Sequence, residues 1–88
     1  MGALVAYEEA IRLNPRLAIA HYQKGNALCH LECYEEAVEA FEESIRLNPQ
    51  HARAYYQMGR ALRHLGRHEE AAEAYEQYIN LMPNSLGV

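Results

Sequence analysis

Cysteine and histidine residues gather at two places in the chain, and both places hold candidate metal ligands. Cys29, His30 and Cys33 lie together, and His64 and His68 form a second pair. A spacing of four residues aligns two side chains on one face of a helix, but a predicted turn interrupts each pair. A structural zinc site needs four ligands, and no second cysteine pair supplies them. We therefore predict no native metal and no cofactor, with adventitious metal at the two histidines as the alternative.

Glutamate is the most frequent ionisable residue and the first candidate for acid–base catalysis. A general base needs a hydrogen-bonding partner and a pocket that excludes water. The glutamates instead fall on helix faces that we expect to be solvated. The chain also has neither a glycine-rich phosphate loop nor a serine nucleophile motif. We predict that the protein is not an enzyme, and we name no catalytic residue.

Three prolines recur at a fixed interval and reveal the elements that must position these side chains. Pro15, Pro49 and Pro83 are 34 residues apart, and each follows a similar apolar tail. A long fixed period indicates stacked copies of one small unit. Proline lacks a backbone donor and disfavours helical geometry in the residue before it, so a helix should end at each proline.

The repeats divide the chain into a half unit and two whole units. Residues 18–51 align with residues 52–85, and about half of the aligned positions are identical, whereas residues 3–15 match only the back half of a unit. The expected divisions, within one domain overall, are a half repeat at 1–15, full repeats at 16–51 and 52–85, and a tail at 86–88.

Each full unit reads as two helices, because apolar and small residues recur at spacings of three and four. The first helices, termed helices A, are expected near 18–31 and 52–65; the second helices, termed helices B, are expected near 3–13, 35–47 and 69–81. Gly66 suits a left-handed turn between helices A and B. Glu32 stands at the matching position of the other unit, where its Cβ should cost on the order of 1 kcal/mol.

Composition limits the compartment and the partners. The net charge of −4 disfavours nucleic-acid binding, which needs a basic surface. No apolar run approaches the ~20 residues of a membrane span, and the first residues do not read as a secretory signal. Two cysteines are few for a small secreted fold. We therefore predict a cytoplasmic protein with reduced thiols that binds neither nucleic acid nor membranes.

The repeat unit resembles the tetratricopeptide repeat, a motif of 34 residues with small, aromatic and proline positions. The residues that match the motif are Tyr55, Met58, Gly59, Leu62, Gly66, His68, Ala71, Tyr75, Tyr78 and Pro83 in the second unit, and His21, Lys24, Gly25, Leu28, Glu32, Tyr34, Ala37, Phe41, Ser44 and Pro49 in the first. The resemblance covers nearly the whole chain. It implies an all-α fold, a right-handed α-solenoid of antiparallel helix pairs with five helices.

Small residues of the motif are expected where helices approach closely. We predict that two helix backbones meet at Gly25, Gly59, Ala37 and Ala71, and that Phe41 and Tyr75 fill the space between helices A and B. His21 and Lys24 occupy sites that the family usually fills with large apolar residues. Their side chains are expected either to loosen the first unit or to extend beside the leading half repeat.

Charge is sorted by helix. Every glutamate except Glu32 lies in a helix B, whereas Lys24, Arg53, Arg60 and Arg63 lie in helices A. Solubility and helix dipoles explain the glutamates, but they do not explain the arginines. The resemblance implies that helices A line a concave groove, and the predicted groove residues are Tyr22, Gln23, Asn26, His30, Arg53, Tyr56, Gln57, Arg60, Arg63 and His64. Tyr22 and Tyr56 are expected to be an exposed pair.

These residues predict a protein-interaction module that holds a peptide or helix of acidic character, since arginine pairs well with carboxylates. Family members that grip the acidic tails of chaperones use a two-carboxylate clamp from three helices A. Asn26 matches that clamp, but Tyr22 and Gln57 replace its lysine and second asparagine, and a third helix A is missing. The sequence does not support chaperone-tail binding.

The ends of the array suggest an alternative function. Five helices with two unprotected ends are marginal for a repeat array, so homo-oligomers could form end to end through Leu4, Val5, Tyr7, Ala72, Tyr75, Tyr78 and Ile79. Tyr78 stands where a small residue would admit a further helix, so we expect it to cover the last face. A structural self-assembling unit and an excised or engineered repeat segment without a native ligand therefore remain open beside the binding module.

Overall fold

The computed structural model describes residues 2–82, and every regular element in that range is a helix. The helices are α1 (Ala3–Leu13), α2 (Ala18–His30), α3 (Tyr34–Leu47), α4 (Ala52–His64) and α5 (His68–Leu81). Their bounds agree with the expected helices to within one residue. Pro83 and the predicted tail at 86–88 lie outside the described residues.

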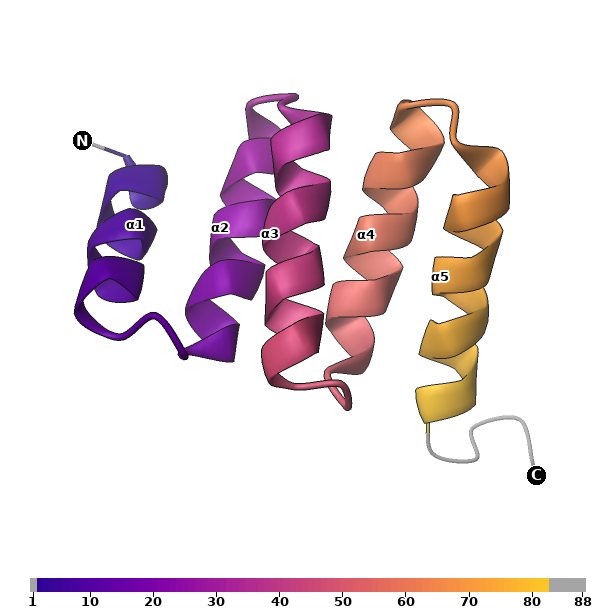
Figure 1. Cartoon of the computed structure of the whole chain (residues 1–88). Helices are drawn as coiled ribbons and strands as arrows, with labels where there is room; N and C mark the ends of the chain where they lie inside the picture. The colour runs from indigo at the N-terminus through magenta and orange to yellow at the C-terminus, as the bar shows by residue number, and fades with distance from the viewer. Residues whose placement is uncertain (1, 83–88) are drawn as a thin grey trace.

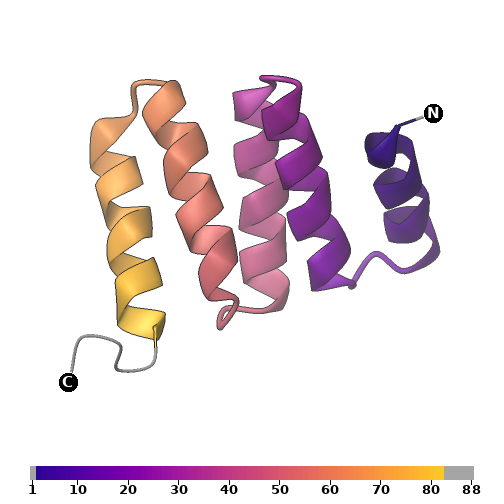
Figure 2. The ribbon, with the colours of Figure 1, turned by 180° about the vertical axis from the view of Figure 1, so that it is seen from behind.

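The helices stand in a row and alternate in direction, with the N-terminus at one end and the C-terminus near the other (Figures 1 and 2). The row measures 43 × 26 × 18 Å. Among the described helices, α1 packs against α2 alone and α5 against α4 alone, while α2 and α4 also touch. The predicted all-α solenoid of five helices is confirmed.

Helices α1, α3 and α5 end two residues before their prolines, as the sequence predicts. Asn14 and Asn48, which precede Pro15 and Pro49, share φ −145° and ψ 87°, and Met82 has φ −71° and ψ 135°. None of these values is helical, which is the effect expected of a following proline.

The two turns between helices A and B have the same left-handed geometry although their residues differ. Gly66 has φ 77° and Glu32 has φ 61°. In both turns the amide of the next residue donates to the helix, over 2.8 Å from Cys33 N to Leu28 O and 2.9 Å from Arg67 N to Leu62 O. This is the Schellman arrangement, in which glycine is preferred. The unusual conformation predicted for Glu32 is therefore present.

An aromatic ring, and not a second backbone, explains why Gly25 and Gly59 are glycines. A Cβ built on Gly25 would lie 2.5 Å from Cε1 of Phe41, and one on Gly59 would lie 2.8 Å from Cε1 of Tyr75. The prediction that two backbones meet at these glycines was therefore wrong in its cause. The rings of Phe41 and Tyr75 do fill the space between the paired helices, as expected.

The core is built from small side chains around these rings. Its buried hydrophobic members are Ala20, Leu28, Ala37, Val38, Ala40, Phe41, Ala54, Ala61, Leu62, Ala71 and Ala74. Ser44 is fully buried and donates a hydrogen bond from Oγ to the carbonyl oxygen of Ala18 over 2.9 Å. This bond satisfies a hydroxyl that would otherwise be costly to bury.

The two polar departures in α2 both find partners towards the leading helix. A ring nitrogen of His21 lies 2.9 Å from the carbonyl oxygen of Pro15, and Lys24 Nζ lies 3.8 Å from a carboxylate oxygen of Glu8. The lysine therefore extends beside α1, as the second of the two expectations has it.

Gly25→Ala should destabilise the protein, although alanine is the better helix former by about 1 kcal/mol. The new methyl group would overlap the Phe41 ring, and overpacking of this kind costs roughly 1–3 kcal/mol. Urea unfolding followed by circular dichroism measures the change. Gly2→Ala is the control because no atom lies within 4 Å of its new Cβ. A Gly25→Ala protein as stable as the wild type would show that the ring contact does not restrict this position.

Candidate binding groove

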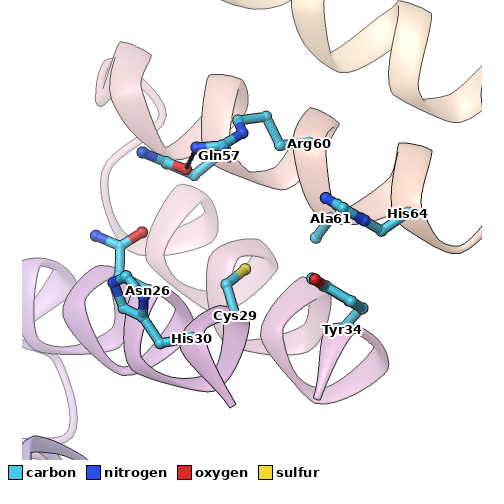
Figure 3. Close-up of a pocket in the computed structure, with 8 residues that line it drawn as sticks. All are labelled: Asn26, Cys29, His30, Tyr34, Gln57, Arg60, Ala61 and His64. Atoms are coloured by element: carbon cyan, nitrogen blue, oxygen red, sulfur yellow. Dashed lines mark hydrogen bonds between the residues drawn. The ribbon is translucent and has the colours of Figure 1, made fainter. Parts of the chain in front are cut away.

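A pocket of about 340 Å³ lies between α2 and α4 and is closed at its floor by the start of α3; we call it the central pocket. It is lined by Asn26, Cys29, His30, Tyr34, Gln57, Arg60, Ala61 and His64. Figure 3 shows these side chains, which come from all three helices. Five of the ten predicted groove residues therefore meet in one cavity.

The arginines of α4 differ from the other helical arginines in their pairing. Arg12, Arg46 and Arg67 each form an ion pair with a glutamate three residues away. Within residues 2–82, no carboxylate lies within ion-pair distance of Arg53, Arg60 or Arg63. Arg60 instead donates from Nη1 to Oε1 of Gln57 over 3.4 Å. The positive charge of α4 is therefore available to a ligand.

A ring stack forms the far wall of the central pocket. Tyr34 and His64 lie parallel, with their ring centroids 4.5 Å apart and their planes 1° apart. Tyr34 comes from a helix B, so reasoning that assigned the groove to helices A missed it. Its position directly after the turn from α2 was the available signal, since a helix start lies beside the end of the helix before it.

Cys29 is a second wall residue that sequence reasoning did not assign to the groove. Burial raises the pKa of its thiol, and the charge of nearby Arg60 offsets part of that effect. A thiol that stays protonated is a poor nucleophile and a poor metal ligand. Cys29 therefore contributes a neutral, half-buried surface to the pocket.

The remaining predicted groove residues do not reach the central pocket. Arg53, Tyr56 and Arg63 are exposed on α4. Tyr22 and Gln23 line a separate cavity between α1 and α2.

Tyr22 and Tyr56 are not an exposed pair. Tyr22 is half-buried, with its ring centroid 5.9 Å from that of Phe41 and 4.5 Å from that of His51. Tyr56 is 39% exposed and packs on Tyr75 and Tyr78 at centroid distances of 5.7 and 5.1 Å. The expectation failed for Tyr22 because the start of α4 covers it. Tyr78, which we expected to cover the last face, is half-buried against Tyr56.

Metal binding and membrane insertion have no structural support in the described range. No three residues among His, Cys and Glu of that range come together as a metal site. None of the five helices is both long and apolar enough to cross a bilayer.

An open row of paired helices with a polar groove is the architecture of helical-repeat interaction proteins. The sequence profile of the tetratricopeptide repeat matches residues 16–84. The chain belongs to the tetratricopeptide repeat family, a family of protein-interaction modules.

Solved structures share this fold. A crystal structure of MamA superimposes with a TM-score of 0.86 at 30% identity, covering 90% of this chain and 46% of MamA. A second MamA structure gives 0.86 at 28% identity and covers 97% of this chain and 46% of MamA. The chain thus spans about half the length of MamA.

The second tetratricopeptide domain of Spaghetti (RPAP3), bound to the HSP90 peptide SRMEEVD, gives a TM-score of 0.89 at 25% identity. That match covers 91% of this chain and 74% of the other. No curated protein sequence matches the chain.

The contact between Tyr22 and His51 predicts a pH-dependent stability. Burial, with a smaller contribution from the charge of Arg53, lowers the pKa of His51 below its ordinary value of 6.5. The unfolded chain therefore binds the proton more tightly than the folded chain. The stability from neutral His51 is complete above pH 6.5 and is lost as the pH falls from there towards the folded pKa.

Urea unfolding at a series of pH values from about 7.5 to 5.5 measures this effect. We expect the unfolding free energy of the wild type to decrease with falling pH, and the slope to be smaller in His51→Gln. The comparison uses the slopes, because the substitution also removes a packing contact. Identical slopes in the two proteins would contradict the assignment to His51.

Proposed function

We propose that the protein is a non-enzymatic interaction module that binds an acidic peptide or helix along α2 and α4. The observation that carries the proposal is the set of unpaired arginines on α4, next to a polar pocket. A ligand carboxylate beside Arg60 would meet further donors from Asn26 and Gln57. Charge-assisted hydrogen bonds of this kind are about twice as strong as neutral ones.

The relatives support a peptide ligand without naming it. The domain of Spaghetti (RPAP3) is bound to the peptide SRMEEVD, which carries three acidic residues. In this chain Tyr22 and Gln57 replace residues that the chaperone-tail clamp requires. The proposed ligand is therefore acidic but differs from that tail. The cytoplasm is the proposed compartment, since the residues that line the pocket include an unoxidised thiol at Cys29.

Neutralising the groove arginines should abolish binding. A random peptide library panned against the wild-type chain should enrich aspartate and glutamate, and fluorescence anisotropy gives the affinity of the best peptide. The Arg53→Gln, Arg60→Gln, Arg63→Gln variant should bind that peptide at least tenfold more weakly, a loss of about 1.4 kcal/mol. Affinity should also fall as salt is added, since exposed charges are screened.

The matched control neutralises the three paired arginines, Arg12, Arg46 and Arg67, in the same way. It changes the net charge by the same amount but leaves α4 untouched, so the peptide affinity should stay within about twofold. Equal losses in both variants would mean that only overall charge matters. A library that enriches no acidic residue would reject the proposed ligand class.

The alternative function, end-to-end homo-oligomerisation, is favoured by a separate observation. Val5 on α1 is 53% exposed and Ile79 on α5 is 54% exposed, although both are large apolar residues. Leu4, Tyr7 and Tyr78 are half-buried and Ala72 is exposed, so each end presents a mixed apolar surface.

Light scattering at protein concentrations up to about 1 mM tests this alternative. Assembly through the ends predicts a mass above that of the 10.1 kDa chain, and Val5→Glu combined with Ile79→Glu should return the mass to the monomer. The groove variant described above is the control and should not change the mass. A monomeric wild type at the highest concentration rules out the alternative.

A further inference from the structure

The aromatic ring of α1 has no glycine-bearing helix beside it in the described chain. Tyr7, Phe41 and Tyr75 are spaced at intervals of 34 residues. The rings of Phe41 and Tyr75 each lie against a glycine of the helix A that comes before them. Tyr7 occupies the same position on α1, but among the described helices α1 packs only against α2, which follows it. One side of the Tyr7 ring is therefore open.

A cavity marks the place where such a helix would lie. It measures about 460 Å³, and we call it the α1 cleft. Its residues are Gly2, Ala3, Leu4 and Tyr7 on one wall and Tyr22, Gln23, Asn26, Ala27, His30 and Leu31 of α2 on the other. Apolar side chains from α1 supply most of the first wall.

The repeat shows what the α1 cleft is shaped to hold. Four residues of its α2 wall are Gln23, Asn26, Ala27 and His30, and the residues 34 positions later are Gln57, Arg60, Ala61 and His64. Those later residues line the central pocket, where α4 faces the neighbouring helix A, α2. By the same register, the α1 cleft faces the position of a helix A that would precede α1.

We propose that the α1 cleft binds an amphipathic α-helix of a partner protein, in the place and orientation of a helix A. The inference is independent of the groove function, because it uses the other side of α2. The bound helix carries glycine or alanine against the Tyr7 ring, since a larger residue would overlap the ring as a Cβ at Gly59 would overlap Tyr75.

The packing of α4 supplies the rest of the pattern for the partner helix. Met58 precedes the glycine and packs against the core, and Leu62, three residues after the glycine, is buried in it. The partner helix therefore has an apolar residue before its small residue and another three positions after it. This is the continuation of an interface that the chain already uses twice.

A second copy of the chain fits the α1 cleft less well than such a helix. The free end of a second copy is α5, which has the sequence of a helix B and contains no glycine. Its exposed apolar residue is Ile79, which is too large to lie against the Tyr7 ring. A helix with the pattern of α4 is the better complement.

The chain itself provides a probe for the cleft. A capped, fluorescein-labelled peptide of residues 52–65 has the helix-A pattern around Gly59. We expect saturable binding to the full chain in fluorescence anisotropy. The affinity should lie in the micromolar to millimolar range, because an isolated helix of this length is only marginally formed before it binds.

Two substitutions test the ring contact. The Gly59→Leu peptide should bind at least tenfold more weakly, although leucine favours the helix. Tyr7→Ala in the chain should weaken the wild-type peptide and partly restore the leucine peptide, because the removed ring leaves room for the larger side chain. This restoration also proves that the Tyr7→Ala chain is folded.

Tyr75→Ala is the matched control on α5. If the peptide entered the chain by displacing α4, this variant would weaken its binding as much as Tyr7→Ala does; the proposal predicts no change. Equal binding of the glycine and leucine peptides, or binding that ignores Tyr7→Ala, would overturn the proposal. A dimer in light scattering that Tyr7→Ala converts to a monomer would also overturn it, because a second copy would then be the occupant.

Discussion

The contact between an aromatic ring and a glycine backbone is the constraint on which the rest of the structure depends. Phe41 against Gly25 and Tyr75 against Gly59 set the separation of each helix pair, because the ring occupies the space where a Cβ would stand. The alanines around the rings then pack into the remaining volume. Since the pairs share one geometry, they stack, and the positions of the groove residues follow from that stacking.

The same packing determines where charge accumulates. The helices B use their apolar side to cover the rings, so their glutamates face outward, where Glu9, Glu43 and Glu70 find arginine partners on the same helix. Helix α4 has no glutamate at all, and its arginines stay without such partners. A basic groove beside an acidic outer surface is therefore a consequence of which helix carries which charge.

The sequence was sufficient for the fold because its strongest signals are local. Pro15 and Pro49 end helices through their own backbone geometry, and the left-handed Glu32 follows from its alignment with Gly66. The site was harder to predict, because its walls come from several helices at once. Tyr34 joins the groove only through its stack on His64, and Tyr22 leaves it only because His51 lies over it. No spacing within one helix encodes such contacts.

The central pocket also has a mechanical meaning. Helices α2 and α4 are each held firmly by α3, but they meet one another only lightly, with the pocket between them. Bending of the row about α3 would therefore change the width of the pocket before it disturbed the core. The stack of Tyr34 on His64 spans part of this gap and opposes the bending. A ligand seated between α2 and α4 would then act as a wedge that sets the curvature of the array.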